Sequence, residues 1–224
     1  MRKLSLTGLA AISHEEALKS IDPKTSEYYQ LVQDIRENCD LDITFIDEII
    51  QTPDDISDVI PYLVDRMCIE KNAHLVGALV HALMRKYCFH LISINKLIEK
   101  YKGFEDTWMK TSNSGAKGQL ARLISLMIDK DDLDKIYDVF LNDDSLGDTR
   151  VWFLDVLNKY KANQKFYDYL LSHKDTYKTS EEYETYESGV LRMKNSVLGM
   201  VINNILNSKK WKKFAEENGV VSGA

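Results

Sequence analysis

Apolar residues recur at three- and four-residue steps along nearly the whole chain, which is the spacing that places them on one face of an α-helix. The run Leu133, Ile136, Tyr137 and Phe140 shows this period clearly. Because the 224 residues include only three prolines and ten glycines, long helices are favoured over many short strands. We find no convincing strand. The sequence therefore predicts an all-α protein.

The first helices are expected to begin near Ser13, Pro23, Phe45 and Pro53. Further helices are expected near residues 72–87, 90–102, 116–129, 131–142, 145–161, 163–173, 180–206 and 208–218. The last two are distinctive, because the helix at 180–206 is apolar around much of its circumference. We expect it to lie inside the C-terminal end, covered by the helix that carries Trp211 and Phe214.

Three of these helices can be superimposed, through the segments VHALMRKY (80–87), ISLMIDKD (124–131) and LDVLNKYK (154–161). The matched columns are Val76/Leu120/Arg150, Leu79/Leu123/Phe153, Val80/Ile124/Leu154 and Leu83/Met127/Leu157. Each helix is expected to be the second of a helical hairpin, in a repeat of roughly 30–45 residues. Since one such hairpin cannot bury its apolar side alone, neighbouring hairpins should stack.

The best unit, DDLDKIYDVFLNDDSLGDTRVWFLDVLNKY (131–160), resembles the HEAT-like repeats of small bacterial proteins. The resemblance implies an α-α superhelix, a solenoid of about five antiparallel helical hairpins in one domain, 1–224. The best repeats are 54–87, 90–130 and 131–162, and 163–224 would hold C-terminal capping helices. In this family an Asp in the turn and an Arg six residues later bridge neighbouring repeats, as Asp144 and Arg150 are spaced. The family's proline occurs only as Pro61, in a repeat without that pair.

The segment NDDSLGDTR (142–150) is rich in side chains that carry oxygen atoms, as calcium-binding loops are. If Asn142 is position 1 of an EF-hand loop, Leu146 and Phe153 occupy positions 5 and 12, and neither can coordinate calcium. Ser145 and Asp148 have instead the spacing of a capping box at a helix start. We therefore expect a turn between two antiparallel helices.

Other motifs of metal or catalytic sites are incomplete. His14-Glu15-Glu16-Ala17-Leu18 begins like the HExxH of zinc proteases, but Leu18 stands where the second histidine is required. Cys88 and His90 offer two ligands where a closed zinc site wants four. A Cys–His catalytic pair assembled in space stays open. The three cysteines, without CxxC spacing, are expected to be reduced and buried. The sequence predicts no metal, no cofactor and no enzymatic activity.

The exposed row of the three matched helices is expected to be mixed in charge. It reads His74, Ala78, His81 and Arg85, then Gly118, Arg122, Ser125 and Asp129, then Asp148, Trp152, Asp155 and Lys159. Binding of a nucleic-acid backbone requires several basic residues along one groove. With a net charge of −6, the chain does not favour nucleic acid or an anionic membrane as a partner.

Arg122 and Trp152 share one repeat column, so their side chains should be neighbours. Trp and Arg are enriched among interface hot spots, and we expect a protein-binding surface that also includes Asp155, Lys159, His81 and Arg85. The alternative is that Trp152 flanks the core and Arg122 pairs with an acidic neighbour. Two further candidate surfaces are the loop 103–118, which holds Trp108, and the Tyr- and Glu-rich segment 167–187.

These observations predict a non-catalytic scaffold that binds another protein, of unknown oligomeric state. An immunity-type inhibitor that neutralises a basic toxin domain is one form of this function. A HEAT-like DNA glycosylase is the enzymatic alternative. The weakly apolar start, interrupted by Ser5, Thr7 and Gly8, is a poor signal peptide. No apolar run approaches membrane-spanning length, and we expect a cytoplasmic protein.

Overall fold

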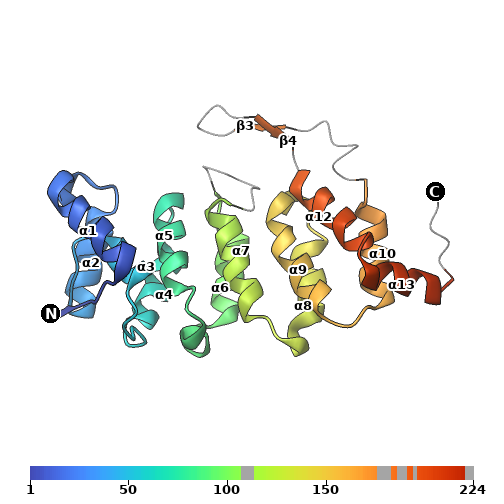
Figure 1. Ribbon diagram of the computed structural model, residues 1–224, viewed down its shortest axis with the longest axis horizontal. Coiled ribbons are helices and arrows are strands. Elements are labelled where there is room, and N and C mark those ends of the chain that lie inside the picture. Colours follow the sequence, from blue (N-terminus) through green and yellow to red (C-terminus); the bar gives the residue numbers. More distant parts are fainter. Residues whose placement is uncertain (107–113, 176–182, 186–190, 194–195, 220–224) are drawn as a thin grey trace. The chain divides into compact units, whose positions relative to one another are not determined.

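Helices make up most of the protein, as the sequence predicts (Figure 1). Its structure is a computed structural model that describes residues 1–106, 114–175, 183–185, 191–193 and 196–219. Strands are short, with two or three residues each. The chain forms two compact units, Met1–Lys102 and Gly103–Ala224. A single domain that spans residues 1–224 remains a prediction from the sequence.

Unit 1 begins with a short strand that pairs in parallel with a second one, Arg2 opposite Leu41. Its elements in chain order are β1 (Arg2–Lys3), α1 (Gly8–Ser20), the 3-10 turn η1 (Pro23–Thr25), α2 (Tyr29–Cys39), β2 (Leu41–Asp42), α3 (Ile46–Gln51), α4 (Ile60–Ile69), α5 (Ala73–Leu83), the 3-10 turn η2 (Lys86–Leu91) and α6 (Ile94–Gly103). Helix α5 packs against α3 and α4, and α2 packs against α4. These contacts make the core of the unit.

Side chains of unit 1 define where its helices start. The Asn72 side chain accepts hydrogen bonds from the backbone N–H groups of His74 and Leu75, at 2.9 and 3.3 Å, and so caps α5. At α3, the Glu48 carboxylate reaches back to the Phe45 N–H at 3.0 Å. Both caps satisfy N–H groups that have no partner within the helix.

Unit 2 is also helical and includes one short antiparallel hairpin. Its elements are α7 (Ala116–Met127), the 3-10 turn η3 (Lys130–Asp132), α8 (Leu133–Ile136), the π-helical turn η4 (Tyr137–Leu141), the 3-10 segment η5 (Asp144–Arg150), α9 (Val151–Lys159), α10 (Gln164–His173), β3 (Tyr183–Thr185), β4 (Leu191–Met193), α12 (Ser196–Leu206) and α13 (Lys209–Glu217). Helix α7 packs against α9, and α12 packs against α9, α10, α13 and η5. Trp211 of α13 is completely buried and packs on Phe166 and Tyr167 of α10.

Several expected helix boundaries are wrong. The α-helices expected to begin near Pro23 and Pro53 begin only at Tyr29 and Ile60, and the helix expected at 72–87 ends at Leu83. Helix α1 begins at Gly8, one and a half turns before Ser13. The expected helix 131–142 is divided into η3, α8 and η4, where the Asn142 N–H bonds to the Tyr137 carbonyl in the i→i+5 pattern of a π-helix. The expected helix 145–161 becomes α-helical only at Val151. In 180–206, α12 begins only at Ser196 and follows the two short strands β3 and β4.

The segment 142–150 joins η4 to α9, which confirms the predicted helix-to-helix connection. Gly147 has φ 53° and ψ −137°, a backbone conformation open only to glycine without strain. The Thr149 hydroxyl donates to the Leu146 carbonyl at 2.6 Å. Asp148 accepts a hydrogen bond from the Leu198 N–H at 2.8 Å, which ties the turn to the first turn of α12.

The matched columns of α5, α7 and α9 have the same burial. Eleven of their twelve side chains are at most 3% exposed, Arg150 included, and Met127 is half-buried. The alignment of the three helices therefore identified the faces that each helix buries.

Candidate functional site

The side chains of Arg122 on α7 and Trp152 on α9 meet at the surface of unit 2. The guanidinium carbon of Arg122 lies 5.1 Å from the centroid of the Trp152 ring. This distance is within the range of a cation–π interaction. Arg122 is exposed, whereas Trp152 is half-buried. The contact that the shared repeat column predicts is confirmed.

Helices α7 and α9 are held in place by their buried faces, which lie opposite the faces that carry Arg122 and Trp152. Leu120, Leu123 and Ile124 of α7 are completely buried, as are Phe153 and Leu154 of α9. With these apolar residues inward, the helical period turns Arg122 and Trp152 outward. The pair is thus displayed on two helices whose positions are fixed by the core.

Polar side chains secure the start of each helix. The buried carboxylate of Asp106 accepts from the Lys117 N–H in the first turn of α7, at 3.0 Å. Before α9, the completely buried Arg150 donates from Nε to the Gly147 carbonyl at 3.1 Å and from Nη1 to the Leu141 carbonyl at 3.3 Å. A surface built on anchored helices presents its side chains with little loss of entropy on binding.

Three more side chains lie one or two turns from the pair on the same helices. Leu126 follows Arg122 by four residues and is 49% exposed. Asp155 and Lys159 follow Trp152 along α9, and both are exposed. We call these five residues the Trp152 surface, namely Arg122, Leu126, Trp152, Asp155 and Lys159.

The Trp152 surface combines apolar area with charges of both signs. Although much of the Asp155 side chain is exposed, desolvation raises the pKa of its carboxyl above the ordinary value, and the nearby Lys159 ammonium opposes this rise. Two cations, one carboxylate, a tryptophan and a leucine are suited to contact a mixed protein surface. In the described part of the chain, no group of three or more His, Cys, Asp or Glu side chains could hold a metal ion.

The other predicted partner-binding residues lie elsewhere. His81 is exposed in the last turn of α5, in unit 1. Arg85 is half-buried, and its guanidinium donates to the carbonyls of Thr52, Ile49 and Ile50 at the end of α3, at 2.9, 2.5 and 3.2 Å. Trp108 lies outside the described residues, as does most of the segment 176–187.

The structure describes only one of the two side chains of the predicted inter-repeat pair. Arg150 is buried against the carbonyls of its own turn, whereas the side chain of Asp144 lies outside the described part of the structure. The pairing of Asp144 with Arg150 stays a prediction.

The expected exposed row is only partly exposed. Ala78, Gly118, Ser125 and Asp148 are buried. The Ser125 hydroxyl donates back to the Arg122 carbonyl at 2.7 Å, and Asp148 faces α12. Conversely, Leu126 was not among the expected surface residues, although its position four residues after Arg122 could have indicated it.

Comparison of the chain with protein-family models, with curated proteins and with solved structures gives no match. Among the described helices, none combines the length and the apolar character needed to cross a membrane.

Proposed function

We propose that the protein is a non-catalytic scaffold that binds another protein through the Trp152 surface. The observation that carries this proposal is the exposed Arg122 guanidinium stacked on the half-buried Trp152 ring. Trp and Arg account for a large share of binding energy at interfaces, where a partner removes them from water. Leu126 adds apolar area beside them.

The charge pattern supports a protein partner over duplex DNA. Asp155 lies between Trp152 and Lys159 on α9, and the chain as a whole carries a net charge of −6. DNA binding by a glycosylase would require a groove with several Lys or Arg side chains. The Trp152 surface supplies two cations and one carboxylate. The DNA glycosylase is therefore the less supported alternative.

A HEAT-like solenoid is part of this proposal. Its support is the equal burial of the matched positions in α5, α7 and α9, together with the packing of α7 on α9 within unit 2. In such a repeat, equivalent second helices lie side by side and present equivalent residues, as Arg122 and Trp152 do.

Affinity capture from a cell extract tests the proposal. The wild-type protein should retain one stoichiometric protein, and Arg122→Glu combined with Trp152→Ala should abolish retention, because the double change reverses a charge and removes the aromatic ring. The matched control is Lys212→Glu combined with Leu91→Ala, two exposed residues outside this surface. Circular dichroism must show both double variants folded.

A second assay in parallel addresses the alternative. Retention by the double variant equal to that of the wild type would contradict the proposal. So would salt-sensitive binding of duplex DNA, or base excision, that is lost on Trp152→Ala.

A further inference from the structure

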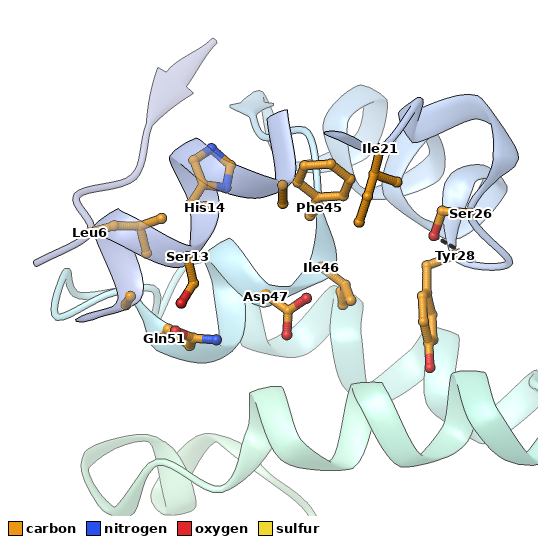
Figure 2. Close-up of a pocket in the computed structure, with 12 residues that line it drawn as sticks. Leu6, Ser13, His14, Ile21, Ser26, Tyr28, Phe45, Ile46, Asp47 and Gln51 are labelled. Atoms are coloured by element: carbon orange, nitrogen blue, oxygen red, sulfur yellow. Dashed lines mark hydrogen bonds between the residues drawn. The ribbon is translucent and has the colours of Figure 1, made fainter. Parts of the chain in front are cut away.

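A cavity of about 420 Å³ lies beneath α1 in unit 1 (Figure 2). It is bounded by α1, by Tyr28 at the start of α2, and by residues 45–51 of α3 and its N-terminal flank. Cavities of 300–1,000 Å³ are the usual size of small-molecule sites. This cavity is separate from the Trp152 surface, and nothing in the preceding proposal uses it.

The cavity exists because α1 presents small residues to the rest of the unit. Ala10, Ser13 and Ala17 lie on the face toward α3, and no residue of α1 is buried. The larger Leu9 points away and is 82% exposed. Three short side chains leave space beside α3 that larger residues would fill.

Two sets of contacts attach α1 to the rest of unit 1. Before the helix, β1 pairs with β2, and the Ser5 N–H donates to the Asp54 carboxylate at 2.7 Å. Within the helix, His14 Nε2 lies 3.8 Å from Glu48 Oε1, and the imidazole meets the Phe45 ring edge-on at a centroid distance of 5.8 Å. These contacts place α1 over the cavity.

The walls of the cavity divide into an apolar part and a polar part. Leu6, Ile21, Phe45 and Ile46 supply apolar surface. Ser13, Asp47 and Gln51 supply polar side chains, and in Figure 2 Asp47 lies beside Ile46, with Ser13 and Gln51 toward the side of Leu6. Such a division suits a ligand with an apolar body and one polar head.

The sign of the charge at the polar end follows from Asp47. Its carboxylate forms no hydrogen bond or ion pair with any residue that the structure describes. Burial raises the pKa of Tyr28 to about 12, and the negative charges of Glu27 and Asp47 add to the rise. A cationic head would pair with Asp47, whereas an anionic head would be repelled.

We propose that this cavity binds a small amphipathic amine. The apolar body of the ligand fills the space between α1 and Phe45–Ile46, and its protonated amino group pairs with the Asp47 carboxylate. The hydroxyl of Ser13 and the amide of Gln51 accept the remaining ammonium hydrogens. The Ser13, Asp47 and Gln51 side chains are exposed, and an ion pair at an exposed site is worth up to about 1 kcal/mol, roughly a fivefold effect on affinity.

Titration with n-octylamine, followed by amide NMR shifts at neutral pH, tests the proposal on the full chain. Saturable shifts confined to α1, α3 and the segment around Tyr28 are expected. Octanol and octanoate, which share the apolar chain, should bind about fivefold more weakly, because neither offers a cation to Asp47.

Two variants separate the apolar part of the site from the charged part. Asp47→Asn should weaken octylamine binding about fivefold, while Asp65→Asn, at another exposed carboxylate, on α4, should leave it unchanged. Ala17→Phe should fill the cavity and abolish binding of all three compounds. If Ala17→Phe fails to fold, Ala10→Leu fills the same space from another turn of α1.

The proposal is overturned if octylamine gives no saturable shifts in these segments. It is equally overturned if octylamine, octanol and octanoate bind alike and Asp47→Asn has no effect, since a purely apolar cavity would then explain the binding.

Discussion

Arg150 is a charged side chain with no exposure to solvent, placed among the largest buried residues of the protein. Its charge is compensated by the carbonyls of Gly147 and Leu141, which lie in the turn before α9. Burial of a cation is tolerated when fixed dipoles replace water. The guanidinium in turn satisfies two carbonyls where the helical ladder is interrupted.

Arg150→Met should therefore lower the free energy of unfolding by about 2–4 kcal/mol, because these carbonyls stay buried without a charged donor. Urea denaturation followed by circular dichroism measures the change. Arg122→Met, at an exposed position in the same unit, is the control and should shift stability by less than about 0.5 kcal/mol. Equal effects of the two substitutions would contradict the structural role of Arg150.

Cys39 illustrates a second consequence of burial. Desolvation, with a contribution from the negative charge of Asp58, raises the pKa of its thiol from 9.0 to about 11. The thiolate is the reactive form, and so at pH 8 the thiol should alkylate about 100-fold more slowly than an ordinary one. Since the folded state favours the protonated thiol, the rate should rise with pH up to about 11.

Iodoacetamide labelling over a pH series, with mass spectrometry of the peptide that contains Cys39, provides the measurement. The unfolded protein in urea is the control and should show the ordinary thiol pKa. A midpoint near 9 in the folded protein would show that burial does not protect this thiol.

Among the elements, α3 is the shortest α-helix of unit 1 in the described chain, and it depends on its ends. The Glu48 carboxylate accepts a hydrogen bond from the N–H group just before the helix, and the Arg85 guanidinium donates hydrogen bonds to the last carbonyls, which have no partners within the helix. A six-residue helix forms too few internal hydrogen bonds to be stable alone. Its position in unit 1 therefore rests on these two side chains.

Arg85→Gln should lower the free energy of unfolding by about 1.5–3 kcal/mol, because the three carbonyls lose charged donors. Thermal denaturation and hydrogen exchange of the α3 amides report the loss. His81→Gln, at an exposed position in the last turn of α5, is the control. A stable Arg85→Gln variant with unchanged exchange would show that Arg85 is not needed for α3.

The helical period of the sequence was sufficient to predict the buried faces of α5, α7 and α9, since the periodicity of apolar residues is a direct consequence of burial. It could not predict the breaks within 131–150. The π turn at Tyr137–Leu141 and the positive φ of Gly147 depend on how these segments pack in three dimensions. A local pattern does not contain that information.

For the whole molecule, one of the two candidate sites could be predicted from the sequence. Arg122 and Trp152 could be placed together because the repeat aligns their columns. The cavity under α1 is formed by residues from three separate segments. It stays empty because the side chains of Ala10 and Ala17 are too small to fill it. No motif marks such a space, and the incomplete HExxH-like pattern at His14 pointed to different chemistry.

The central claim is that a protein partner binds the Trp152 surface, and site-specific photo-crosslinking at position 126 tests it most directly. A benzoylphenylalanine in place of the exposed Leu126 lies beside Arg122 and should form one protein adduct in cell extract. The adduct should resist nuclease and disappear with Arg122→Glu, whereas the same probe at exposed Leu91 should form none. No adduct at position 126, or an adduct with nucleic acid, would contradict the account.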